Sequence, residues 1–146
     1  MSEFRKRINR LKIKLGYTLK LSKALGMPKM ITIEPTNHCQ LKCPLCPTGE
    51  GDTNVEYGLL ELDKYKKVVD KFAKWAQTFQ LFTWGEPFLN KSFVEMISYA
   101  SQHPHKIRSV VSANLNDITD EQIKGLVTSN LNMLGVSIDG TTQEAY

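Results

Sequence analysis

The sequence has little cysteine, and all three of its cysteines fall within residues 39–46. An odd count, without the apolar core of a signal peptide, argues against a secreted protein stapled by disulfides. No stretch approaches the roughly 18 apolar residues of a membrane span, so we expect no transmembrane helix. With 41% hydrophobic and 23% charged residues, the composition excludes a disordered or collagen-like chain and fits a globular protein.

The basic charge is concentrated at the N-terminus. Residues 1–29 carry nine basic residues and one acid, whereas residues 30–146 carry ten basic and fourteen acidic residues. An apolar stripe recurs in this segment at helical spacing, formed by Phe4, Ile8, Leu11, Leu15 and Leu19. We expect a helix that ends at Gly26 and Pro28 and packs this stripe on the body of the protein. The alternative is a surface helix for acidic lipid or nucleic acid; we do not expect nucleic acid, because no interleaved arginines and aromatics follow.

After residue 29 the order strand, loop, helix recurs. The expected strands are residues 29–34, 78–83, 107–112 and 133–138, and the expected helices are residues 61–76, 91–101 and 119–128. Thr119 and Gln122 have the spacing of a capping box at the start of the third helix. This alternation predicts an α/β fold with a parallel sheet, in which all four strands end at one rim.

Each expected strand is followed by a polar cluster. The cysteines follow the first strand, and the other three clusters are Gly85-Glu86-Pro87, Ser112-Ala113-Asn114, and Ser137 with Asp139. Parallel α/β sheets bind their ligands at this rim. The coincidence of four clusters predicts a binding site there, although each turn taken alone also fits an ordinary loop.

Cys39, Cys43 and Cys46 have the spacing C-x3-C-x2-C, which is compatible with four chemistries. A disulfide is disfavoured by the odd count, and a redox pair of Cys43 and Cys46 would leave Cys39 without a role. Zinc could be held by the three cysteines together with His38. An iron–sulfur cluster held by three thiolates would keep one iron without a protein ligand, and such an open position is reactive.

The run EPTNHCQLKCPLCP at residues 34–47 resembles the signature of the radical S-adenosylmethionine (radical SAM) superfamily. Gly85-Glu86-Pro87 resembles the family's Gly-Glu-Pro motif, and residues 137–140 resemble its Ser-x-Asp-Gly. Ser112-Ala113-Asn114 stands where many members have Thr-Asn-Gly. Three positions depart from the pattern: Trp84 replaces the first Gly of the common Gly-Gly-Glu-Pro form, Leu115 stands where Gly is usual, and Leu45 replaces a residue that is often aromatic.

The resemblance implies a partial (βα)6 barrel, of which residues 30–146 supply about four of the six units after the basic N-terminal helix of residues 1–29. It implies that Cys39, Cys43 and Cys46 bind a [4Fe-4S] cluster and that S-adenosylmethionine (SAM) chelates the fourth iron. SAM is then cleaved to a 5′-deoxyadenosyl radical that abstracts hydrogen from a substrate. The implied cofactor-binding residues are Gly85, Glu86, Ser112, Asn114, Ser137 and Asp139.

The same resemblance implies a ferredoxin- or flavodoxin-like electron donor, a reducing cytoplasmic compartment, and a peptide or small-molecule substrate that the sequence does not identify. Because about four units do not complete the barrel, we expect the natural chain to continue past Tyr146. The cysteine loop is of the kind often followed by a SPASM-type cysteine-rich extension. The alternative function is a zinc-binding interaction module, with His38 as the fourth ligand and a basic arm.

Overall fold

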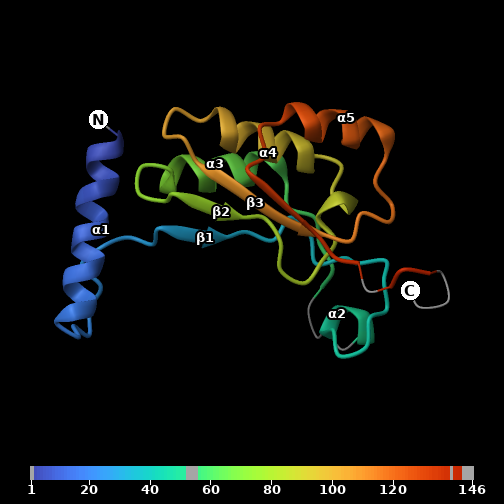
Figure 1. Ribbon diagram of the computed structural model, residues 1–146, viewed down its shortest axis with the longest axis horizontal. Helices are drawn as coiled ribbons and strands as arrows, with labels where there is room; N and C mark the ends of the chain where they lie inside the picture. Colours follow the sequence, from blue (N-terminus) through green and yellow to red (C-terminus); the bar gives the residue numbers. More distant parts are fainter. Residues whose placement is uncertain (1, 52–55, 139, 143–146) are drawn as a thin grey trace.

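A computed structural model describes residues 2–51, 56–138 and 140–142 of the protein (Figure 1). Its centre is a sheet of four parallel strands in the order β1-β2-β3-β4. The strands are β1 (Met30–Thr32), β2 (Thr78–Gln80), β3 (Arg108–Ala113) and β4 (Met133–Val136). The predicted α/β fold with a parallel sheet is therefore confirmed. Each strand is shorter than or equal in length to its sequence prediction.

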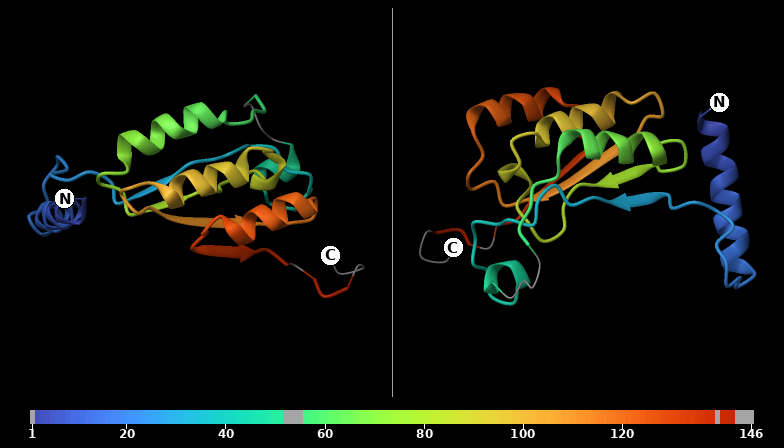
Figure 2. Two further views of the ribbon diagram at one scale, coloured as in Figure 1. Left: turned by 90° about the horizontal axis from the view of Figure 1, so that it is seen from above. Right: turned by 180° about the vertical axis from the view of Figure 1, so that it is seen from behind.

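Three helices cover one face of the sheet (Figures 1 and 2). They are α3 (Leu62–Phe72), α4 (Phe93–Gln102) and α5 (Asp120–Thr128). The side chains that these helices and the sheet bury together include Tyr65, Val69, Phe79, Leu81, Phe93, Met96, Ile97 and Val111. Each large apolar side chain buried in this way contributes about 1.5–3 kcal/mol, so this layer stabilises the sheet that positions the rim.

The predicted capping box of α5 is confirmed. The Thr119 hydroxyl accepts a hydrogen bond from the backbone N–H of Gln122, and the Gln122 side chain accepts one from the backbone N–H of Thr119 at 3.0 Å. Two short helices were not predicted, namely α2 (Pro47–Glu50) and the 3-10 helix η1 (Pro87–Leu89). Both lie in the loops that follow β1 and β2, where their few residues give no periodic signal.

The N-terminal helix α1 (Ser2–Thr18) lies beside the amino end of β1 (Figure 1). The expectation that it ends at Gly26 was wrong. Lys20 adopts φ 49°, and the N–H of Leu21 donates to the carbonyl of Gly16 at 3.0 Å, which closes the helix with a left-handed cap. Such caps usually carry glycine, so the end of the helix at a lysine could not be predicted from the sequence.

The expectation that the apolar stripe of α1 packs on the body was also wrong. Phe4, Leu11 and Leu15 are 66%, 67% and 51% exposed, whereas Lys6 and Asn9 are only 3% and 5% exposed. The reason is that the polar face of α1 finds hydrogen-bond partners on the body, which turns the stripe outward to solvent.

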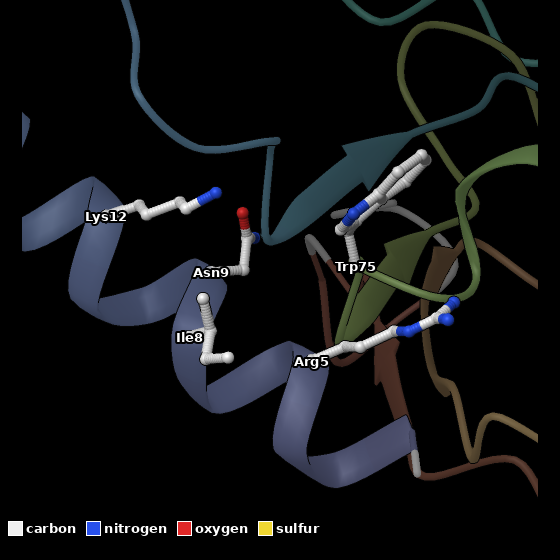
Figure 3. A pocket seen from close by; sticks show the side chains of 5 residues that line it. All are labelled: Arg5, Ile8, Asn9, Lys12 and Trp75. Carbon is white, nitrogen blue, oxygen red and sulfur yellow. The ribbon is translucent and has the colours of Figure 1, made fainter.

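The contacts of the polar face are specific. The Lys6 ammonium donates to the backbone carbonyls of His105 and Lys106. The Asn9 amide exchanges two hydrogen bonds of 2.8 Å with the backbone of Met27. A shallow cavity remains between the helix and the body, lined by Arg5, Ile8, Asn9, Lys12 and Trp75 (Figure 3).

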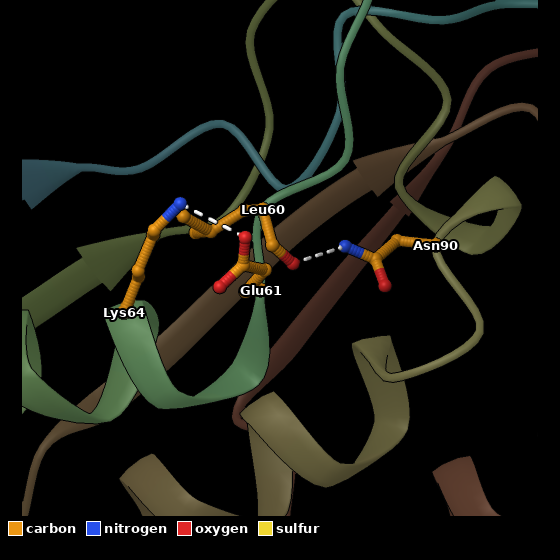
Figure 4. Close-up of polar contacts among 4 residues, drawn as sticks. All are labelled: Leu60, Glu61, Lys64 and Asn90. Carbon is orange, nitrogen blue, oxygen red and sulfur yellow. Dashed lines mark hydrogen bonds and ion pairs between the residues drawn. The ribbon is translucent and has the colours of Figure 1, made fainter.

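Asn90 fixes both ends of the long loop that carries the cysteines. Its buried side-chain amide donates to the carbonyl of Pro35 at 2.8 Å and to the carbonyl of Leu60 at 2.9 Å (Figure 4 draws the second bond). The N–H of Leu60 donates in turn to Pro35. The nearby ion pair of Lys64 and Glu61, also in Figure 4, is exposed and contributes little. The base of the loop is thus tied to η1 before the loop reaches the rim.

Within the part of the chain that the structure describes, no helix combines the length and the apolar character that crossing a membrane requires.

Candidate functional site

A cavity of about 290 Å³ opens at the carboxyl ends of the strands. It is lined by Cys39, Leu41, Cys43, Cys46, Phe82, Thr83, Gly85, Glu86, Ser112, Ala113, Asn114 and Ser137. The three predicted metal ligands thus share one cavity with every predicted cofactor-binding residue except Asp139, which lies outside the described residues. Segments that are far apart in the sequence meet here because the strands are parallel.

The cysteine loop is held in a compact shape by α2. The three cysteines are free thiols and partly buried. A Cβ added at Gly49 of α2 would lie 2.6 Å from the carbonyl oxygen of Cys43, so only glycine permits this contact. The Glu50 carboxylate accepts from the N–H of Leu45 at 3.1 Å, and Leu45 adopts φ 66°. The conformation of the cysteine loop therefore depends on the close contact between Gly49 and the backbone of Cys43, which any other residue type at position 49 would prevent.

The Gly-Glu-Pro loop after β2 packs against the cysteine loop, backbone to backbone. A Cβ added at Gly85 would lie 2.0 Å from the carbonyl oxygen of Thr36 and 2.7 Å from that of His38. The N–H of Glu86 donates to the same His38 carbonyl at 2.7 Å. Glycine is required here by the close approach of the two loops.

Glu34, the first residue of the signature run at residues 34–47, was given no role of its own, and it joins the same two loops. Its carboxylate oxygen Oε1 accepts from the N–H of Trp84 at 2.7 Å and from the N–H of Gly85 at 3.2 Å. Its sequence signal was its place in that run, at the end of the first strand.

Glu86 presents a buried carboxylate at the cavity, being only 3% exposed. Its Oε2 accepts from the N–H of Asn114 at 2.7 Å, and its Oε1 accepts from the N–H of Phe88 at 3.3 Å. Burial raises the pKa of Glu86; the two hydrogen bonds oppose this shift, and the charge of Asp117 adds to it. Because a carboxylate oxygen has the capacity to accept two hydrogen bonds, the group can still receive a cationic ligand from the cavity.

The Asn114 amide connects β3 to the first cysteine. Its Nδ2 lies 3.8 Å from the sulfur of Cys39. Its Oδ1 accepts from the side chain of Gln40 at 2.9 Å and from the N–H of Asn116 at 3.0 Å. These two donors orient the amide so that its N–H group points toward the sulfur. Gln40 was not predicted, because a polar loop residue carries no signal of its own.

The thiol of Cys39 is in a less polar setting than water. Burial raises the pKa of Cys39, a hydrogen bond from the backbone of Leu41 opposes the shift, and the charges of Glu86, Cys43 and Cys46 add to it. Three thiols and a carboxylate thus face one cavity, and cysteine binds a metal as the thiolate, so a positively charged group is needed there for the three cysteines to act as ligands.

Leu115, one of the departures from the family pattern, adopts φ 61°. This is the left-handed region, which glycine enters freely and other residues enter at a cost of about 1–2 kcal/mol. Leu115 packs against the hydrophobic core, which offsets the strain. Leu115 thus holds a backbone conformation that favours glycine.

The zinc alternative needs His38 beside the three cysteines, and this residue does not line their cavity. Among the residues that the structure describes, no three His, Cys, Asp or Glu side chains converge on a point suited to one metal ion. His38, the fourth ligand of the zinc alternative, is exposed and its ring lies 4.6 Å from the ring of Tyr57. A cluster binds each cysteine at a different iron, so its sulfurs do not have to meet at one point.

Comparison with known proteins agrees with this geometry. The family model described as the radical SAM superfamily matches residues 33–146. The chain belongs to the radical SAM superfamily. The match includes the cysteine loop, the Gly-Glu-Pro loop and the ends of β3 and β4, and leaves α1 outside.

Relatives of this radical SAM chain include enzymes with different products. It is 33% identical over 105 residues to Fe-coproporphyrin III synthase of Methanosarcina barkeri, covering 72% of this chain and 26% of the relative. It is 27% identical over 123 residues to PqqA peptide cyclase of Rhodopseudomonas palustris, covering 83% of this chain and 31% of the relative. The chain thus spans about a quarter to a third of the length of these curated relatives.

Solved structures share the fold. The crystal structure of BtrN in complex with AdoMet and 2-DOIA superimposes with a TM-score of 0.66 at 20% identity, covering 75% of this chain and 45% of BtrN. BtrN in an open conformation gives a TM-score of 0.65 at 17% identity, covering 85% of this chain and 55% of BtrN. At identities this low the comparison shows a shared fold alone. The shared fold is consistent with the first part of a (βα)6 barrel.

Proposed function

We propose that this chain carries the cluster loop and much of the SAM-binding rim of a radical SAM enzyme that abstracts hydrogen from its substrate. The observation that carries the proposal is that the three cysteines share one cavity with five other motif residues. Together these eight residues come from the ends of all four strands. In this proposal residues 30–146 are the catalytic core, and residues 1–29 are a separate basic segment.

In this proposal Cys39, Cys43 and Cys46 bind three irons of a [4Fe-4S] cluster. Thiolates are the usual ligands of such clusters, and three of them leave one iron open. When bound there, such a cluster would supply the electron for reductive cleavage of SAM, which gives methionine and a 5′-deoxyadenosyl radical. The N–H group of Asn114, oriented by Gln40, stabilises the negative charge on the Cys39 sulfur.

The remaining rim residues bind SAM. Glu86 offers its buried carboxylate to the ammonium of the methionyl group, and Gly85 lets the backbone come close to that group. Ser112, Asn114, Ser137 and Asp139 bind the ribose hydroxyls or the carboxylate through hydrogen bonds. The apolar side chains of Leu41, Phe82 and Ala113, which also line the cavity, exclude water from a ligand bound there.

The electron donor in this proposal is a small ferredoxin- or flavodoxin-like protein, and the location is the cytoplasm, where thiols stay reduced. The substrate is a peptide or a small molecule. The names of the relatives include both kinds, a peptide cyclase and a synthase of Fe-coproporphyrin III.

The test is anaerobic reconstitution of the full-length protein with iron and sulfide. We expect a brown protein with about four irons per chain that cleaves SAM to 5′-deoxyadenosine when reduced. Cys43→Ala should abolish both the cleavage and the cluster. Thr48→Ala, which alters a buried residue of the neighbouring α2 without removing a thiol, serves as the control for loop damage.

Two outcomes would contradict the proposal. A colourless protein that binds one zinc ion per chain would support the zinc-binding interaction module instead. Undiminished cleavage of SAM by Cys43→Ala would remove this cysteine from the ligand set.

A further inference from the structure

The outer face of α1 presents a row of apolar side chains to solvent, which neither the fold nor the proposed chemistry explains. The row consists of Phe4, Ile8, Leu11 and Leu15, which are 66%, 37%, 67% and 51% exposed. Single exposed apolar residues are common, but a continuous row on one helix face marks an interaction surface. We call this row the α1 stripe.

The opposite face of α1 is already occupied. Lys6 donates to the loop at residues 105–106, and Asn9 bonds with Met27. A Cβ added at Gly26 would lie 2.8 Å from Ile13, so residues 26–27 lie directly against the helix there. The contacts with the body therefore fix the helix with Phe4, Leu11 and Leu15 of the α1 stripe pointing away from the body. Ile8, at the edge of the α1 stripe, also lines the cavity beside Trp75.

A row of three cations borders the α1 stripe. Arg7, Arg10 and Lys14 follow one another at spacings of three and four residues, so they form a line along the helix. All three are exposed, and with Leu11 they line a shallow surface depression. None of them takes part in an ion pair within the described part of the chain.

The positive charge and the apolar row together indicate which kind of partner binds the α1 stripe. A partner must neutralise the exposed cations Arg7, Arg10 and Lys14, and it must also bury the apolar side chains of the α1 stripe. Nucleic acid would neutralise the cations but leave the stripe in water. A second copy would bring the same positive charge against this one. A bilayer with anionic headgroups meets both requirements, since interfacial helices bury their apolar side while cations contact lipid phosphates.

We infer that α1 docks the protein on an anionic membrane surface. The helix lies in the plane of the interface, with the α1 stripe at the boundary between headgroups and acyl chains. Arg7, Arg10 and Lys14 contact the lipid phosphates. Because α1 lies beside the amino end of β1 and the cysteine loop lies at the other end of the sheet, the rim cavity stays clear of the membrane (Figure 1).

The test is co-sedimentation of the full-length protein with vesicles. We expect binding to phosphatidylcholine vesicles that contain phosphatidylglycerol, release by salt, and no binding to phosphatidylcholine alone. The variant R7E/R10E/K14E should bind at least about tenfold more weakly, since each cation near the surface contributes on the order of 1 kcal/mol. The matched control K64E/K67E/K71E changes the net charge equally on exposed positions of α3 and should keep its binding.

A second measurement does not depend on charge reversal. Phe4→Trp places a fluorophore on the α1 stripe with little change in shape or polarity. The fluorescence that this tryptophan adds to that of the wild type should shift to shorter wavelength on anionic vesicles. Lipids that carry a quencher near the headgroup should quench it. An equivalent tryptophan at Lys67 on α3 should show neither change.

The inference would be overturned by failure to bind anionic vesicles, by equal binding to phosphatidylcholine alone, or by equal losses in the α1 and α3 variants. It would also be overturned if R7E/R10E/K14E lost binding to duplex DNA or RNA while vesicles were never bound. Dimerisation that Leu11→Asp abolishes, without vesicle binding, would assign the α1 stripe to a second copy. None of these outcomes depends on whether a cluster binds at the rim.

Discussion

The rim and α1 differ in whether the residues that make their contacts stand in recognisable motifs. At the rim, many contacts join one motif to another even where the two are distant in the sequence, as when the N–H of Asn114 donates to Glu86. The orientation of α1 depends instead on the contact of Lys6 with residues 105 and 106, about a hundred residues later. Motifs can therefore be interpreted from the sequence. The direction that an apolar stripe of a helix faces cannot, because it depends on contacts with residues far away in the sequence, here those of Lys6.

The largest effect is expected where two loops of the rim meet. Gly85→Ala should destabilise the protein by about 3 kcal/mol or more, because the new Cβ would lie 2.0 Å from the carbonyl oxygen of Thr36. Gly58→Ala is the matched control, since no atom lies within 4 Å of a Cβ added there. Urea denaturation of both variants measures the difference. Equal stabilities would mean that the two loops do not approach as described.

A second prediction concerns the buried carboxylate at the rim. Glu86→Gln should cost about 1–3 kcal/mol, because an amide cannot accept from the N–H groups of both Phe88 and Asn114. Urea denaturation of the apo-protein at neutral pH measures this loss.

The pH dependence of that loss has a definite sign. Burial raises the pKa of Glu86 above its ordinary value of 4.5, so the folded protein binds this proton more tightly than the unfolded chain does. The resulting stability is complete below pH 4.5 and is lost as the pH rises through the raised pKa. The gap between wild type and Glu86→Gln should therefore be wider at acid pH than at neutral pH. A gap that widens toward neutral pH would show that the pKa is lowered instead.

The third prediction tests the orientation of α1 directly. Asn9→Ala should cost about 1–2 kcal/mol, because two hydrogen bonds with the backbone of Met27 are lost. Leu15→Asn, at an exposed position of the α1 stripe, should change stability by less than about 0.5 kcal/mol. If Leu15→Asn were the more damaging change, the α1 stripe would face the body and not solvent.

The smallest effect is expected at Gln40. Gln40→Leu should leave stability nearly unchanged but free the Asn114 amide to rotate away from Cys39. Loss of an N–H contact with a ligand sulfur lowers the reduction potential of a cluster, here by roughly tens of millivolts. Potentiometric titration of the reconstituted protein measures the shift. Lys42→Leu, an exposed change in the same loop, should leave the potential where it is.

Much of the fold could be predicted because periodicity and capping are local. The capping box of Thr119 and Gln122 located α5, and the strand–helix alternation gave the parallel sheet. The end of α1 could not be found, since Lys20 occupies a backbone conformation in which glycine is the usual signal.

The candidate site could be predicted for the residues that carry motifs and not for those that support them. Gly85 and the cysteines stand in recognisable patterns, and they line one cavity. Glu34, Gln40 and Asn90 hold the loops together through hydrogen bonds to distant segments, and no spacing in the sequence indicates those partners. Asp139 lies outside the described residues and stays a prediction.

The central claim is that three thiolates leave one iron open for SAM. Electron–nuclear double resonance on the reduced, reconstituted protein tests it, using SAM with an isotope-labelled carboxylate or amine. The account predicts a hyperfine coupling from the label, which Cys43→Ala abolishes together with the cluster. A cluster with a full complement of iron and no coupling to labelled SAM would contradict the account.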